Sequence, residues 1–106
     1  MVTKEAIRTW FMGLQDDICA SLEILDGAGE FQEDLWQRDG GGGGRSRSIS
    51  GRRIEKGGVN FSAVEGILPD KIKSKLQLDN GDFFATGVSI VLHPHNPHVP
   101  IIHMNV

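Results

Sequence analysis

The sequence contains a single cysteine, Cys19, among its 106 residues. One cysteine excludes an internal disulfide and is typical of a reducing compartment, so we expect a cytoplasmic protein. No apolar run approaches the roughly 20 residues of a transmembrane helix, so we expect no membrane span. The N-terminus lacks a basic segment followed by an apolar one, and we therefore expect no signal peptide.

Charged residues and histidines are unevenly distributed along the chain. No Asp, Glu, Lys or Arg follows Asp82, and no histidine precedes His93, so the C-terminal stretch is mostly apolar and holds all 4 histidines. Histidine is suited to proton transfer and to metal binding. The net charge of -3 is too small to predict a nucleic-acid partner, and the 39% hydrophobic and 24% charged residues are typical of a globular domain.

The spacing of apolar residues predicts the elements of the chain. Steps of three and four over residues 3–26 predict an amphipathic helix, with Thr3 and Gly27 as its caps and Cys19 in its core-facing stripe. Strands and loops are expected over residues 31–66, with a turn at Ser50 and a break at Gly57–Gly58. One or two helical turns within residues 68–78 and a turn at 79–82 then lead to a strand pair over 83–106.

Five consecutive glycines, residues 40–44, precede Arg45 and Arg47. The run can be a flexible linker, because glycine has a high entropic cost of ordering. It can also be a loop whose bare backbone lies against a ligand, with Arg45 and Arg47 binding carboxylates or phosphates. It is not a P-loop, because the spacing to a Lys-Ser/Thr pair is missing.

The last predicted strand pair carries the candidate site. A period of two places Ser89 and His93 on one face of the first strand, and His103 and Asn105 on one face of the second. If the strands are neighbours, these four side chains line one patch. The proline-rich residues 94–100 predict a stiff connector that contains His95 and His98. From composition alone, a hydrogen-bonded core histidine is favoured over a catalytic role for His103.

The chain stops at Val106 inside a predicted strand. We therefore expect residues 1–106 to form a single incomplete domain, the N-terminal fragment of a larger protein, and to be inactive alone.

Four motifs follow one another along the chain: FMGLQDDIC at 11–19, FQEDLWQRDGGGGGRSR at 31–47, EKGGVNFS at 55–62, and GVSIVLHPHNP at 87–97 with HMNV at 103–106. In this order they resemble the oxygen-dependent coproporphyrinogen III oxidase family, of which the chain covers about the N-terminal third. The resemblance implies an α+β fold, with a mostly antiparallel sheet flanked by helices and an active-site cleft over one face. It also implies a homodimer.

The implied activity is the oxidative decarboxylation of two propionates of coproporphyrinogen III to vinyl groups, giving protoporphyrinogen IX in haem synthesis. Dioxygen is the acceptor, and no cofactor is implied as required. By resemblance, His103 is the proton donor and Ser89, Asn105 and Val106 bind substrate. His93 and His103 are implied as ligands of a divalent metal that the reaction does not need.

The residues themselves add two interpretations. A tetrapyrrole with four carboxylates favours Arg45 and Arg47 as further substrate contacts. Outside the oxidase hypothesis, the four histidines can form a small metal-binding module, or the glycine-arginine segment can form a non-catalytic anion-binding domain.

Overall fold

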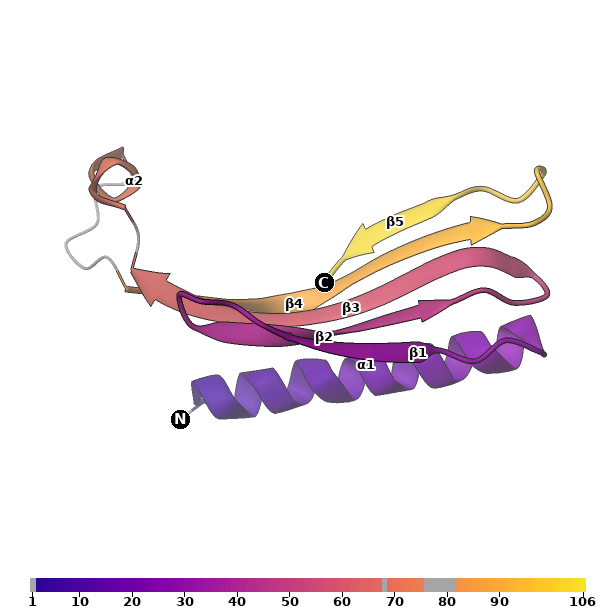
Figure 1. The fold of residues 1–106 in the computed structure, drawn as a ribbon, viewed down its shortest axis with the longest axis horizontal. Coiled ribbons are helices and arrows are strands. Elements are labelled where there is room, and N and C mark those ends of the chain that lie inside the picture. Colours follow the sequence, from indigo (N-terminus) through magenta and orange to yellow (C-terminus); the bar gives the residue numbers. More distant parts are fainter. Residues whose placement is uncertain (1, 68, 76–81) are drawn as a thin grey trace.

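The computed structural model describes residues 2–67, 69–75 and 82–106, and it consists of a long helix lying against a five-stranded sheet (Figure 1). The elements in chain order are α1 (Lys4–Asp26), β1 (Gln32–Gln37), β2 (Gly42–Ile49), β3 (Ile54–Ile67), α2 (Asp70–Lys75), β4 (Asp82–Pro94) and β5 (Ile102–Asn105). Each strand pairs antiparallel with the next in the sequence, so the sheet is a meander. The expected α+β class is confirmed.

The predicted first helix is confirmed together with both of its caps. The Thr3 hydroxyl accepts a hydrogen bond from the Ala6 N–H at 3.1 Å, which satisfies one of the free donors of the first turn. At the other end Gly27 has a φ of 84°, a left-handed conformation that glycine adopts without steric cost.

The core lies between α1 and the centre of the sheet. Cys19, Val59, Val88 and Ile90 are its buried members, and α1 packs across β3 and β4 with an apolar stripe that includes Phe11, Leu14, Ile18 and Leu22. The predicted burial of Cys19 is therefore confirmed, at 3% exposure. Removing such side chains from water is the main favourable term in folding. This packing fixes which face of the sheet α1 covers.

The predicted break at Gly57–Gly58 is wrong. β3 continues through both glycines to Ile67, with only a bulge between Ile54 and Lys56. A Cβ on Gly57 would meet the side chains of Ile49, Ile54 and Leu92 at 2.8–3.2 Å. Neighbouring side chains fill the space that a side chain at Gly57 would need, so the glycine serves close packing rather than a turn.

The glycine run is only partly a loop. Residues 39–41 form the turn between β1 and β2, and Gly41 and Gly42 have positive φ angles of 124° and 83°. Gly42–Gly44 then belong to β2, where all three pair with β3 and Gly43 and Gly44 also pair with β1, so these residues form a strand and not a flexible linker or a loop. A Cβ at Gly43 would collide with the Trp36 carbonyl oxygen, which explains why no side chain fits there.

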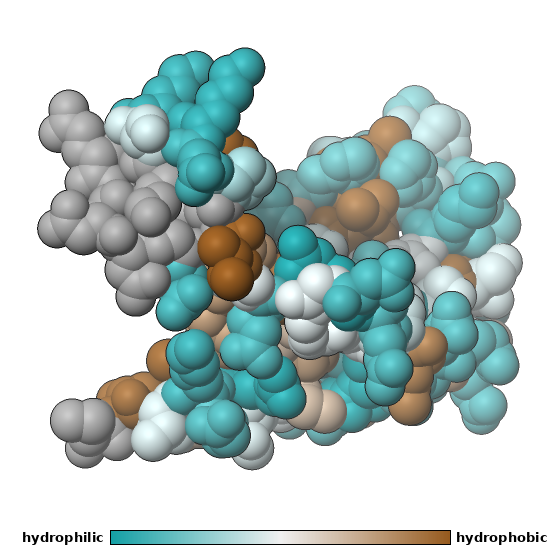
Figure 2. Space-filling view, turned by 60° about the vertical axis from the view of Figure 1, so that its left-hand side comes forward, coloured by the Kyte–Doolittle hydropathy of each residue, from teal (hydrophilic) through white to brown (hydrophobic). Residues whose placement is uncertain are grey.

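The predicted helical turns after β3 correspond to α2, and the predicted turn at residues 79–82 lies outside the described residues apart from Asp82, which begins β4. No helix in the described ranges combines the length and the apolar character of a membrane span. Figure 2 shows a largely hydrophilic surface with separate hydrophobic patches. Several apolar side chains are nevertheless exposed, among them Trp10 at 62% and Ile24 at 82%.

Candidate functional site on the open face of the sheet

The two faces of the sheet differ in what covers them. Residues directly opposite each other in antiparallel strands point to the same face, so the register assigns every side chain. Val59 and Ile90 are register partners and are buried toward α1. Asn60 and Ser89, one position along each strand, are register partners on the opposite side. We call this opposite side the open face.

Five polar residues lie in register across the open face. Asp34 of β1 pairs with Ser46 of β2, Ser46 with Asn60 of β3, Asn60 with Ser89 of β4, and Ser89 with Asn105 of β5. We call these residues the polar row. Because adjacent strands are about 4.8 Å apart, the row brings residues far apart in the sequence into one line of neighbouring side chains.

A hollow of about 600 Å³ lies over part of the polar row, and its lining includes Trp36, Ser46, Asn60, Ser62, Ser89 and Asn105. Its volume falls within the range of small-molecule sites, about 300–1,000 Å³. Val106 also lines it and exchanges two backbone hydrogen bonds with Val88, of 2.9 and 3.2 Å. The structure thus brings together Ser89, Asn105 and Val106, the three residues expected near substrate at this end of the chain.

His93 and His103 lie on the same open face. His103 is the register partner of Val91 and His93 that of Lys56, and the two imidazole rings are 5.8 Å apart between centroids. The alternative of a core histidine is wrong for His103, because its side chain is exposed on β5. The predicted patch of Ser89, His93, His103 and Asn105 on one face is therefore observed.

The histidine pair by itself does not fit a metal ion. Structural zinc sites use four protein ligands and catalytic ones three. Among the residues that the structure describes, no group of three or more His, Cys, Asp or Glu side chains can hold a metal. His93 and His103 supply two nitrogen ligands, and we derive no chemical step through a metal from them.

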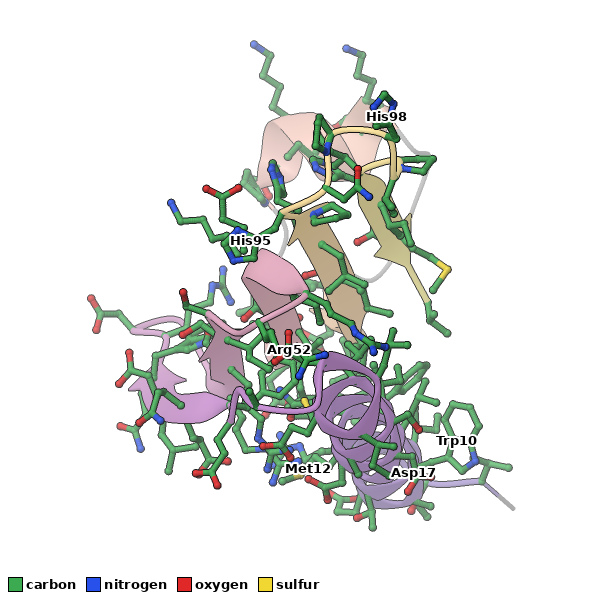
Figure 3. The ribbon with its side chains drawn as sticks, turned by 90° about the vertical axis from the view of Figure 1, so that its right-hand side faces the viewer. Trp10, Met12, Asp17, Arg52, His95 and His98 are labelled. Atoms are coloured by element: carbon green, nitrogen blue, oxygen red, sulfur yellow. The ribbon has the colours of Figure 1, made fainter. Side chains whose placement is uncertain are left out.

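His95 and His98 lie in the connector between β4 and β5, as predicted, at the end of the molecule shown in Figure 3. A ring nitrogen of His95 lies 3.0 Å from the Gly51 carbonyl oxygen, and the His95 N–H donates to the Arg53 carbonyl oxygen at 3.1 Å. These contacts attach the connector to the turn between β2 and β3. His95 therefore supports the fold locally.

Arg45 and Arg47 are not brought together with Ser89 and His103. They pair in register with Phe61 and Val59, so they point toward α1. Arg45 Nε donates to Gln15 Oε1 at 2.7 Å and Arg45 Nη2 to Asp16 Oδ1 at 2.9 Å. Arg45 thus joins β2 to α1, and its role in substrate binding stays a prediction.

Arg47 has partners of the same kind. Its guanidinium lies 2.8 Å from Asp16 Oδ1 and 2.9 Å from Glu33 Oε1, and its side chain is 17% exposed. Both arginines are therefore paired with carboxylates of this chain on the helix side. This pairing does not favour the anion-binding alternative, which needs guanidinium groups open to an external ligand.

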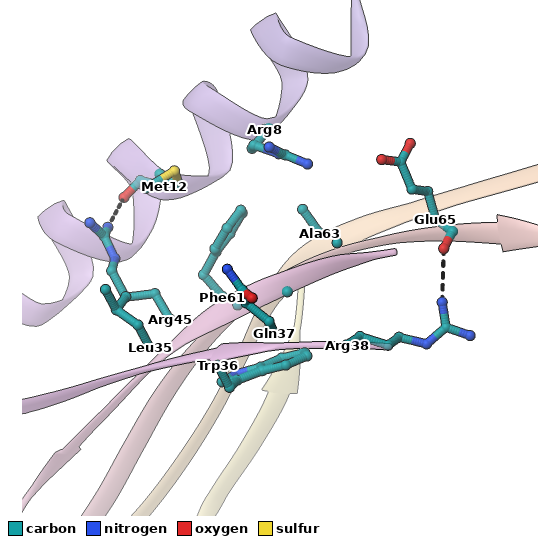
Figure 4. Close-up of a pocket in the computed structure, with 13 residues that line it drawn as sticks. Arg8, Met12, Leu35, Trp36, Gln37, Arg38, Arg45, Phe61, Ala63 and Glu65 are labelled. Atoms are coloured by element: carbon teal, nitrogen blue, oxygen red, sulfur yellow. Dashed lines mark hydrogen bonds between the residues drawn. The ribbon is translucent and has the colours of Figure 1, made fainter. Parts of the chain in front are cut away.

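A second hollow, of about 570 Å³, lies between α1 and the sheet (Figure 4). Arg8 and Met12 border it from α1, Phe61 borders it from β3, and Arg38 borders it from just after β1. Two hydrogen bonds join lining residues of this hollow to each other. Arg45 donates to the Met12 carbonyl oxygen at 3.0 Å, and Arg38 donates to the Glu65 carbonyl oxygen at 2.8 Å. This hollow is separated from Ser89 and His103 by the sheet.

Polar side chains on the two faces differ in their partners. Gln15, fully buried beneath α1, donates to the carbonyl oxygens of Arg45 and Val59 at 2.6 and 2.9 Å. On the open face, no side-chain hydrogen bond to another described residue is formed by Ser46, Asn60, Ser89 or Asn105. Polar groups inside folds are normally paired. Because these open-face side chains have no protein partner, they are available to a ligand.

The hollow has further lining residues that were not predicted from the sequence as site residues, among them Trp36, Ser46, Asn60 and Ser62. A period of two over residues 59–63 indicates that Asn60 and Ser62 lie on the face opposite Val59, Phe61 and Ala63. Nothing in the sequence gave the register of Asn60 against Ser89, because that pairing joins positions 29 residues apart.

Comparison with known proteins shows the family of the chain. Residues 6–106 match the sequence profile of the family described as coproporphyrinogen III oxidase. Proteins named oxygen-dependent coproporphyrinogen-III oxidase from Synechococcus sp. strains CC9902 and CC9605 are each 51% identical over 106 residues, which is 97% of this chain and 29% of theirs. The protein of that name from Parasynechococcus marenigrum WH8102 is 52% identical over 101 residues, 92% of this chain and 28% of its own.

This chain therefore spans less than a third of the length of these relatives, and the match runs over both α1 and the whole sheet. From the extent of the profile match and the identity to these proteins, the chain belongs to the coproporphyrinogen III oxidase family.

Proposed function

We propose that the protein catalyses the oxygen-dependent oxidative decarboxylation of coproporphyrinogen III, in which two propionates become vinyl groups and protoporphyrinogen IX of haem synthesis is formed. One observation carries the proposal. Ser89, Asn105 and His103 lie on the same uncovered face, next to a hollow with unpaired polar groups, in a member of this family.

The reaction itself says which groups the site needs. Each step converts a –CH2–CH2–COO⁻ group, dioxygen and one proton into –CH=CH2, carbon dioxide and hydrogen peroxide. A C–H bond and the C–C bond to the carboxylate break, and two electrons pass to dioxygen. Because one proton is consumed with each peroxide formed, the site needs a proton donor, and an imidazole is suited to that role near neutral pH.

The position of His103 supports this role. It lies two residues from Asn105 on the same face of β5, a separation of about 7 Å along the strand. A substrate held at Ser89 and Asn105 therefore has the imidazole of His103 beside it. Holding reactant and proton donor in a fixed arrangement removes much of the entropic barrier to their reaction.

The polar groups of the hollow match the substrate in kind. Ser89 and Asn105 offer hydroxyl and amide donors, and a propionate carboxylate accepts hydrogen bonds at both oxygens. Hydrogen bonds to a charged group are stronger than those between neutral groups. The carboxylate is thereby held at the edge of the hollow.

We also propose a cytoplasmic homodimer, with dioxygen as co-substrate and no required cofactor. The single cysteine supports a reducing compartment, and the four shared motifs support the dimer. Light scattering on the purified protein tests the dimer: a mass of one subunit at micromolar concentration would contradict it.

Activity measurements test the function. The protein expressed from its complete reading frame is assayed for oxygen uptake with coproporphyrinogen III and for vinyl products after oxidation to porphyrins. We expect His103→Gln to lower kcat by about 10²–10⁴-fold, the range for loss of a general acid. His98→Gln, a matched change in the connector, should leave kcat unchanged.

Ser89→Ala should raise KM, whereas Ser21→Ala on the exposed side of α1 should not. The proposed function is wrong if the unaltered protein consumes no oxygen with this substrate. The assignment of His103 alone is wrong if His103→Gln keeps full kcat.

A further inference from the structure

The polar row extends the candidate site beyond the residues at the C-terminal end of the chain. Ser89 and Asn105 occupy its β4 and β5 positions, and Asn60 is the next member, on β3. At a strand spacing of about 4.8 Å, Asn60 is as close to Ser89 as Asn105 is. A ligand that contacts Ser89 from the hollow therefore meets Asn60 on its other side.

Asn60 is an unusual residue for its position. β3 is the central strand of the sheet, and asparagine is depleted in strands. Its side chain is half-buried, yet no hydrogen bond joins its amide to another side chain or backbone group in the described part of the chain. Asn60 thus borders the hollow with an amide, two N–H donors and one carbonyl acceptor, that has no protein partner among the described residues.

The surroundings of Asn60 leave room for a ligand. Beside the polar row, on the same face, runs a line of small residues in register: Gly44, Ser62 and Gly87. Trp36 lies at the β1 end of that line and borders the hollow with its indole. The side chains next to Asn60 on this face are therefore short or missing, and the Trp36 indole bounds the resulting space on one side.

The charge of the row restricts where a carboxylate can bind. Asp34 at the β1 end is an exposed carboxylate that repels an anion, whereas Asn60, Ser89 and Asn105 are neutral donors. An anionic group is therefore favoured over the β3–β5 part of the row. Because propionates are the charged groups of the proposed substrate, this part of the row is where one of them fits.

We propose that Asn60 is a further substrate-positioning residue, whose side-chain N–H donates to the propionate carboxylate that Ser89 also binds. The inference rests on the proposed function. Asn60 and Ser89 then hold the two oxygens of one carboxylate from adjacent strands. Such two-point binding orients the C–C bond that breaks relative to His103.

Two isosteric substitutions test the role of the donor. Asn60→Thr and Asn60→Val introduce side chains that have the same shape as each other and that both favour strands. Only the threonine can donate a hydrogen bond. Substrate affinity is measured without oxygen, by quenching of tryptophan fluorescence on titration with coproporphyrinogen III. We expect Asn60→Val to weaken binding and raise KM by about 10-fold to 100-fold, as for loss of a hydrogen bond to a charged group, and Asn60→Thr to lose clearly less.

A third variant reports on charge. Asn60→Asp keeps the shape of asparagine but places a carboxylate against the propionate, so binding should weaken at least as much as in Asn60→Val and recover as the pH falls. The urea midpoint of each variant shows whether the fold is kept. If Asn60→Val proves unstable, the affinity of Asn60→Asp decides the matter, since equal binding by Asn60→Asp and wild type would overturn the role.

The outcomes separate this inference from the function itself. If the wild-type protein turns over coproporphyrinogen and Ser89→Ala raises KM, but Asn60→Val and Asn60→Thr bind like wild type, only the role of Asn60 is wrong. If the wild-type protein neither binds nor oxidises the substrate, the proposed function is wrong.

Discussion

The indole of Trp36 lies directly against Gly44, its register partner in the neighbouring strand. A Cβ added to Gly44 would collide with the indole ring and with the Phe61 carbonyl oxygen. The glycine in the run that precedes Arg45 is thus needed for the position of Trp36, which borders the candidate site.

Gly44→Ala is expected to displace Trp36 and to cost about 1–3 kcal/mol of unfolding free energy, as for overpacking elsewhere. Urea unfolding measures the loss, and tryptophan emission in a Trp10→Phe background reports the displacement. Gly13→Ala is the control, because a Cβ at Gly13 meets nothing within 4 Å. In that helical position alanine should stabilise by about 0.5–1 kcal/mol. Equal stability of both variants would contradict the packing role of Gly44.

Arg45 is expected to stabilise the protein by attaching α1 to β2. Its guanidinium donates to Gln15, to Asp16 and to the Met12 carbonyl oxygen, a geometry that one ammonium group cannot reproduce. Arg45→Lys should therefore lower the free energy of unfolding by about 1–3 kcal/mol, since Gln15 loses a partner while buried. The control is Arg52→Lys, an exposed site, which should be neutral.

A kinetic comparison of the same Arg45 variant addresses its other predicted role. If KM for coproporphyrinogen rose while stability stayed at the wild-type value, Arg45 would be a substrate contact and not a structural link. We expect the loss to appear in the urea midpoint.

Asp26 should make the protein sensitive to acid. Its buried carboxylate accepts five backbone hydrogen bonds, three of them from residues 52–54 in the turn between β2 and β3. These bonds, with that from Ile54 the largest, hold the pKa of Asp26 well below its ordinary 3.8. Because the folded pKa is depressed, this stabilisation is complete above about pH 4 and is lost as the pH falls toward the folded pKa.

Asp26→Asn removes the charge and replaces one acceptor by a donor that faces backbone N–H groups. Its urea midpoint at pH 7 should fall well below that of wild type, and the acid-induced loss of stability should become shallower. Asp17→Asn, on the exposed side of α1, provides the comparison. A wild-type midpoint for Asp26→Asn at pH 7 would refute this account of the turn.

Cys19 should react slowly with thiol reagents. Its side chain is 3% exposed, and burial raises the pKa of the thiol, so little thiolate forms near neutral pH. At pH 8 the folded protein should be modified at least about tenfold more slowly than the protein in urea, as followed with a chromogenic disulfide. Fast labelling of the folded form would mean that α1 detaches from the sheet.

Patterns among residues close together in the sequence were enough to predict much of this protein. The 3.6-residue period and the caps Thr3 and Gly27 define α1, because both depend on residues within a few positions. A period of two was enough to put Ser89 and His93 on one face, and the four motifs were enough to identify the family.

Tertiary structure alone decided the rest, because each such feature depends on which distant residue becomes a neighbour. Gly44 lies against the Trp36 indole because β1 pairs with β2 in this register, and Arg45 contacts Gln15 because the same register turns it toward α1. Asn60 joins Ser89 only through the pairing of β3 with β4. A one-residue change of register would move these side chains to the other face, and the period of two within a single strand does not by itself say which residue becomes the partner.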